Sequence, residues 1–105
     1  MTRFNLKETK TINEEGIVDG ALRRIAVITR QESIPNINRI KLAYYTRAHT
    51  VHADGTPTEE APLSETRASD AFVAIRNHAE YLTRHDARHR RFTYDFASET
   101  FIARS

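Results

Sequence analysis

The chain has 105 residues and a formal net charge of +2, with 39% hydrophobic and 29% charged residues. It has no run close to the roughly 20 apolar residues that a membrane-spanning helix needs, and it has no cysteine, so integral membrane proteins, disulfide frameworks and cysteine nucleophiles are excluded. A domain of this length buries only about two thirds of its unfolded surface, which favours stabilisation by a partner subunit.

The N-terminal segment, residues 1–20, is predicted to form a short β-hairpin. Apolar and polar residues alternate in its first half, and turn-forming residues follow at positions 13–16. The next segment, residues 22–30, also fits a helical period, but the two glycines just before it would each cost about 1 kcal/mol inside a helix. Three β-branched residues in a row, at positions 27–29, favour a strand instead.

A second hairpin, with one apolar and one cationic face, is predicted for residues 22–47. Residues 31–38 form its loop, and residues 39–47 return as a strand. The hairpin has six basic residues against one acid, Glu32. The cationic side of the returning strand consists of Lys41, Ala43, Tyr45 and Arg47.

Two interpretations remain open for each part of the C-terminal half. For residues 66–82, apolar residues at helical spacing favour an amphipathic helix, while their alternation also allows a strand. For residues 83–102, Thr83 and Asp86 have the form of a capping box and favour a helix, but a final strand over residues 92–96 fits equally well.

The sequence contains no motif that indicates catalysis, metal binding or a cofactor. His49 and His52 are three residues apart, and His85 and His89 are four apart, but neither pair comes with a cysteine or with an acid at the catalytic spacing. No nucleophile elbow, Walker A or dinucleotide-binding pattern occurs. We therefore predict neither an enzyme, nor a metal site, nor a cofactor.

The cationic side of the second hairpin is the most informative feature for function. Lysine and arginine that alternate with small and aromatic residues on an extended surface can neutralise phosphates, and Tyr45 offers a plane on which an unpaired base can stack. The alternative is a solvated sheet face that binds nothing. The pattern predicts nucleic-acid binding and leaves this alternative open.

Three segments follow one another in an order that resembles a known family. LRRIAVITRQES (22–33), followed by an asparagine-containing loop and NRIKLAYY (38–45), is similar to a central hairpin in that family. TRASDAFVAIRN (66–77) resembles the next sheet strand, and YLTRHDARHRRF (81–92) resembles the start of a C-terminal helical region. The family is the coat proteins of small single-stranded RNA bacteriophages, the levivirus-like group, and the resemblance spans about residues 22–102.

The resemblance implies an α+β fold within one domain, residues 1–105. Its parts would be an N-terminal β-hairpin (1–20), an antiparallel five-stranded sheet (21–80) and a C-terminal helix (83–103) that clasps the partner subunit. It also favours a strand over a helix for residues 66–77. The apolar sheet positions that this helix would cover are Ile25, Val27, Ile40, Leu42, Val73 and Ile75.

The function that the resemblance implies is that of a structural coat protein. In this family, interlocked homodimers assemble into an icosahedral shell, and the inner sheet face binds single-stranded genomic RNA, including a hairpin whose capture represses replicase translation. The chain would then belong to the virion, and to the host bacterial cytoplasm during assembly, with no membrane and no small-molecule substrate. The residues expected to contact RNA are Arg24, Arg30, Lys41, Tyr45, Arg47, Phe72 and Arg76.

An alternative interpretation assigns the chain to another class of protein. In this interpretation the protein is a small non-enzymatic nucleic-acid-binding regulator, with a basic β-ribbon and one long helix over residues 64–89. The coat protein should be rich in sheet and form particles, whereas the regulator should be richer in helix and remain a small oligomer.

Overall fold

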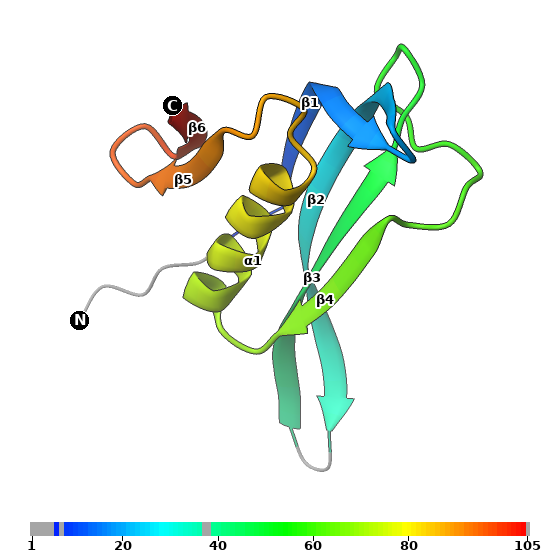
Figure 1. The fold of residues 1–105 in the computed structure, drawn as a ribbon. Coiled ribbons are helices and arrows are strands. Elements are labelled where there is room, and N and C mark those ends of the chain that lie inside the picture. Colours follow the sequence, from blue (N-terminus) through cyan, green and yellow to red (C-terminus); the bar gives the residue numbers. More distant parts are fainter. Residues whose placement is uncertain (1–5, 7, 37–38, 105) are drawn as a thin grey trace.

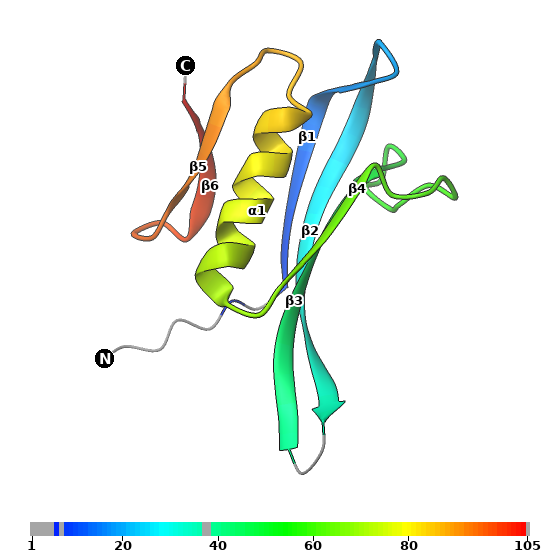
Figure 2. The same cartoon turned by 60° about the horizontal axis from the view of Figure 1, so that its bottom comes forward.

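The computed structural model describes residue 6, residues 8–36 and residues 39–104, without the side chains of residues 36 and 39–41. The predicted α+β class is confirmed: a four-stranded antiparallel sheet, one helix across one of its faces, and a two-stranded hairpin beyond the helix form three layers (Figures 1 and 2). The sheet has four strands, in the order β1-β2-β3-β4, and not the predicted five, because residues 71–80 belong to the helix. The elements are β1 (Thr9–Val18), β2 (Ala21–Asn36), β3 (Arg39–Thr50), β4 (Ser64–Ala68), α1 (Ala71–Arg84), β5 (Arg91–Asp95) and β6 (Thr100–Arg104).

The first hairpin turns at Asp19 and Gly20, and its two strands are β1 and β2. Both turn residues have a positive φ (51° and 81°), which is the backbone that lets a two-residue turn match the twist of its strands. Residues 13–16, the predicted turn, are instead an irregularity inside β1, where a Cβ atom on Gly16 would lie 2.7 Å from an isoleucine side chain of β2. The turn predicted within residues 1–20 is therefore wrong, and part of the predicted first strand lies outside the described residues.

β2 and β3 form the predicted second hairpin, and both strands are longer than predicted. Residues 31–36 continue β2 instead of forming a loop, because pairing with β3 satisfies their backbone groups. β4 pairs only with residues 44–48 of β3. The far halves of β2 and β3 therefore extend beyond the rest of the sheet as a two-stranded ribbon (Figure 1).

Residues 71–84 form the helix that the apolar spacing favoured, so the strand that the resemblance implied for residues 66–77 is wrong. Asp70 caps the helix, since its Oδ1 accepts hydrogen bonds from two backbone N–H groups of the first turn, at 2.7 and 3.3 Å. Only the segment before this cap, β4, is extended. With 14 residues and a polar outer face, α1 is too short and too polar to cross a membrane, and it is the one helix of the described residues.

The C-terminal segment forms the hairpin β5–β6 instead of the helix predicted for residues 83–103. α1 ends at Arg84, and Thr83 lies in its last turn, where its hydroxyl donates to the carbonyl oxygen of Ala79 and accepts from the N–H of Phe92, both at 2.9 Å. The apparent capping box thus marks the end of one helix, not the start of another. The strand interpretation that the sequence left open is the one observed, and no helix that could clasp a partner follows α1 among the described residues.

The hydrophobic core lies between the sheet and α1. Ile25 and Val27 of β2 are fully buried there, as predicted. Leu42 is 51% exposed because it lies on the ribbon, outside the pairing with β4. Tyr44 and Ala48 of β3 and Ala68 of β4 also belong to the core. Val73 and Ile75, which were predicted as sheet positions, instead reach the core from α1, and Tyr94 and Phe101 reach it from the C-terminal hairpin and not from a helix.

Candidate nucleic-acid interface

We name the face of the sheet that points away from α1 the open face. Thr29 of β2 hydrogen-bonds His78 of α1, so its neighbour Arg30 points away from the helix. The register of the two strands then places Tyr45 beside Arg30. By this alternation the open face consists of Lys10 and Ile12 of β1, Arg24, Ala26, Ile28, Arg30 and Glu32 of β2, Ala43, Tyr45, Arg47 and His49 of β3, and Glu65 and Arg67 of β4.

Three residues of the predicted RNA site meet around a shallow depression on the open face. Arg30, Tyr45 and Arg47 line it, and its volume is about 180 Å³. Pro57, from the loop between β3 and β4, forms part of its wall. Lys10 donates a hydrogen bond of 2.6 Å to a carbonyl oxygen of the same loop and so ties the loop to β1.

The predicted arginines of the open face are paired with carboxylates. The pairs are Arg24 with Glu14, Arg30 with Glu8, and Arg47 with Glu65. The N–O distances of the last two are 3.0 and 2.6 Å. Exposed pairs of this kind contribute at most about 1 kcal/mol each. The sequence of β2 and β3 predicted a cationic face. The observed face has mixed charge, because β1, the residue before it and β4 add acidic side chains.

Tyr45 has two arginines near its ring. The guanidinium carbons of Arg47 and Arg67 lie 6.0 and 5.5 Å from the ring centroid, within the range of a cation–π contact. The register of β4 places Arg67 opposite Tyr45, and no carboxylate of the described residues lies within salt-bridge distance of it. Arg67 is not among the site residues predicted from the sequence, although the alternation of residues 65–67 is a signal that points to it.

The side chain of Lys41 is not among those that the structure describes, so Lys41 is not placed in the site. Its backbone pairs with Ile34 in the ribbon. Its contact with RNA remains a prediction.

His49 adds a titratable group to the depression. Burial lowers its pKa, the positive charge of Arg47 lowers it further, and Glu65 acts in the opposite direction. The imidazole is therefore neutral near pH 7 and adds no positive charge to the site. Among the described residues, no three histidine, aspartate or glutamate side chains are grouped so that they could hold a metal ion.

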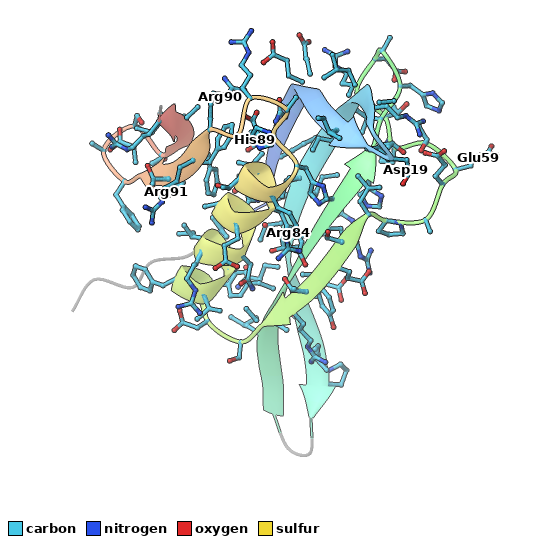
Figure 3. All side chains as sticks on the ribbon, viewed as in Figure 1. Asp19, Glu59, Arg84, His89, Arg90 and Arg91 are labelled. Atoms are coloured by element: carbon cyan, nitrogen blue, oxygen red, sulfur yellow. The ribbon has the colours of Figure 1, made fainter. Side chains whose placement is uncertain are left out.

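Phe72 and Arg76, the other two predicted RNA contacts, are not on the open face. Both belong to α1, which covers the opposite face of the sheet, so the prediction that they extend the RNA face is wrong. They line a second, larger hollow, a groove of about 750 Å³ between α1 and β5. Figure 3 shows Arg91, which also lines it, on β5, beyond the segment that carries His89 and Arg90.

The predicted site residues thus divide between two surfaces. Arg24, Arg30, Tyr45 and Arg47 share the open face, and Phe72 and Arg76 lie in the groove. The open face joins arginines and an aromatic ring on neighbouring strands, which is an arrangement that can bind unpaired bases and phosphates. No family model, curated protein or solved structure matches this chain, so the functional interpretation rests on these residues and their geometry.

Proposed function

We propose that this protein binds single-stranded RNA on the open face of its sheet. The observation that carries the proposal is the depression in which Tyr45 lies between arginines of two strands. A base can stack on the tyrosine ring while Arg47 and Arg67 contact the phosphates that flank it. Stacking of this kind tolerates any base, so we expect little sequence preference.

The carboxylates of the open face do not prevent binding. Each ion pair is exposed on both sides and is held weakly, so a phosphate can replace Glu8 beside Arg30 or Glu65 beside Arg47. The replacement leaves the arginines neutralised and displaces counterions from the RNA. We therefore expect an affinity that falls steeply as the salt concentration rises.

The direct test is to replace Tyr45 with alanine and measure the binding of fluorescent oligouridine by anisotropy. Loss of one stacked base should weaken binding by about 1 to 3 kcal/mol, which is roughly 5- to 150-fold in Kd. Phe96→Ala removes an exposed aromatic ring from the opposite side of the molecule and should leave the affinity unchanged.

Substitutions of charged residues test the electrostatic part of the proposal. Glu65→Gln removes the carboxylate that competes for Arg47 and should tighten RNA binding, while Arg67→Gln should weaken it. Equal binding by the Tyr45→Ala variant and the parent protein would contradict the proposal.

Assembly into a coat is a further proposal that rests on the family resemblance. The elements assigned to it, a strand over residues 66–77 and a clasping helix over residues 83–103, are replaced by α1 and the hairpin β5–β6. The observed ribbon and single helix are closer to the alternative, a small nucleic-acid-binding regulator, although the helix covers residues 71–84 and not the predicted 64–89. Electron micrographs and light scattering of the protein expressed alone decide between them. Spherical shells would support the coat protein, whereas a small oligomer that binds RNA would contradict it.

A further inference from the structure

The groove between α1 and β5 is a larger hollow than the depression on the open face, about 750 Å³ against about 180 Å³. It is open to solvent along its length instead of being enclosed. Side chains from both elements line it, among them Phe72, Arg76, Glu80, Arg84, Arg91 and Phe96. The RNA site on the open face shares none of these residues.

The floor of the groove is apolar. Phe72 at the start of α1 and Phe96 in the turn after β5 are 55% and 54% exposed, and their ring centroids are 6.1 Å apart. Ile75, Ala79 and Phe92 continue the lining. Exposed apolar surface that is gathered in one place, and rimmed by polar residues, is typical of a protein interaction site.

Three arginines line the groove without a carboxylate partner. For Arg76, Arg84 and Arg91, no acid of the described residues lies within salt-bridge distance, whereas every predicted arginine of the open face has one. Arg84 instead lies over the ring of Tyr81, 5.3 Å from its centroid. Glu80 is the one acid among the lining residues, so the groove has an excess of positive charge.

The dimensions and chemistry of the groove favour a protein segment. From residue 72 to residue 84 the helix is about 18 Å long, which matches roughly three turns of a second helix laid beside it. A small molecule would be poorly covered in so open a hollow. A nucleic acid could pair its phosphates with the arginines, but it has few apolar groups to cover Ile75, Ala79 and Phe92, which the apolar face of a peptide would bury.

We infer that this groove binds an acidic amphipathic segment of a protein partner. Apolar side chains at helical spacing would rest on Phe72, Phe96 and Ala79, and carboxylates at the edge of the segment would pair with the three arginines. This inference goes beyond RNA binding and does not depend on it. The protein would then hold RNA and a protein partner on opposite sides.

The test uses a synthetic helical peptide of about four turns, with leucine and phenylalanine on one face and glutamate beside them. Titrated into the ¹⁵N-labelled protein, it should shift the backbone amide signals of α1 and β5 and leave those of the ribbon unchanged. A peptide with lysine in place of every glutamate should bind at least about tenfold more weakly.

Matched variants locate the interaction. The double variant Arg84→Gln/Arg91→Gln should weaken peptide binding about tenfold, whereas Arg23→Gln, which removes an arginine that pairs with Glu60 elsewhere, should not change it. Tyr45→Ala should also bind the peptide normally, which separates this inference from the RNA site. If a variant misfolds by circular dichroism, each single substitution is measured instead. Equal binding of both peptides, or amide shifts at the groove with oligouridine but not with the acidic peptide, would overturn the inference.

Discussion

Replacing Asp86 with alanine is expected to lower the free energy of unfolding by about 3 kcal/mol, because a buried carboxylate that several donors share would be lost. Asp86 lies just after α1 and is only 3% exposed. Its side chain accepts hydrogen bonds from Asn13 of β1 at 2.9 Å and from the guanidinium of Arg90 at 2.7 and 3.0 Å. The backbone N–H groups of Arg88 and Arg90 also donate to it.

The segment around Asp86 joins the end of α1 to β1. The backbone N–H of Ile17 donates to the carbonyl oxygen of His85 at 3.1 Å, and that of Ala87 donates to the carbonyl oxygen of Glu15 at 2.6 Å. Without the carboxylate, the buried amide of Asn13 would lose its acceptor, and the guanidinium of Arg90 would keep only its longer contact with Glu15, at 3.7 Å. The substitution therefore weakens the attachment of the helix and of the C-terminal hairpin at once.

Urea unfolding followed by circular dichroism measures this loss. Asp54→Ala is the matched control, because Asp54 also accepts hydrogen bonds but lies on an exposed loop, and it should change stability by less than about 1 kcal/mol. A double-mutant cycle with Asn13→Ala should show coupling between the two residues. A loss for Asp86→Ala no larger than that of the control would show that the donors find water instead.

Local sequence patterns predicted the parts of the fold that depend on neighbouring residues. The alternation of β2 and β3 gave the correct face for Arg30 and Tyr45, and apolar spacing gave the helix α1. The family resemblance was wrong where it replaced this spacing with a strand, because Asp70 caps a helix at that point. Thr83 and Asp86 have the residue types of a capping box, and types alone cannot tell the end of one helix from the start of another.

The charge of the candidate site could not be predicted in the same way. Glu8 and Glu65 reach the open face only because β1 and β4 pair with β2 and β3, and such pairings between distant segments are not encoded in local alternation. For Arg67, the alternation of residues 65–67 shows that it shares a face with Glu65, but only the pairing of β4 with β3 places it opposite Tyr45. The groove depends on how the C-terminal hairpin packs against α1, which was not foreseen once residues 83–103 were assigned to a helix.

Acid is expected to destabilise the protein through His78, by about 2 kcal/mol between pH 7 and pH 5 and by about 4 kcal/mol near pH 3.5. His78 of α1 is fully buried, and its ring stacks on Phe101 with centroids 4.2 Å apart. Its two ring nitrogens hydrogen-bond the hydroxyls of Thr29 at 2.7 Å and Thr11 at 3.0 Å, and so connect α1 to two strands.

The direction of this effect follows from the proton uptake of the two states. Burial lowers the pKa of His78 from 6.5 to about 3 in the folded protein. Between these two values the unfolded chain binds a proton that the folded chain does not, so stability is complete above pH 6.5 and is lost as the pH falls toward 3. Asp86 acts only at lower pH, because its carboxyl is ionised in both states at pH 5 and the hydrogen bonds from Arg90 lower its folded pKa further.

Urea unfolding of the parent protein and of His78→Gln at pH 7 and pH 5 isolates this contribution. Burial also lowers the pKa values of His49 and His85, so both proteins should lose some stability in acid, and the parent should lose about 2 kcal/mol more. Glutamine keeps a donor and an acceptor for Thr11 and Thr29 but does not titrate. Should this variant fail to fold, the ring signals of His78 in the parent protein give the answer by NMR. If the ring of His78 takes up its proton near pH 6.5 in the folded state, the prediction is contradicted. The folded and unfolded states would then bind the proton equally, and His78 would cause no loss of stability in acid.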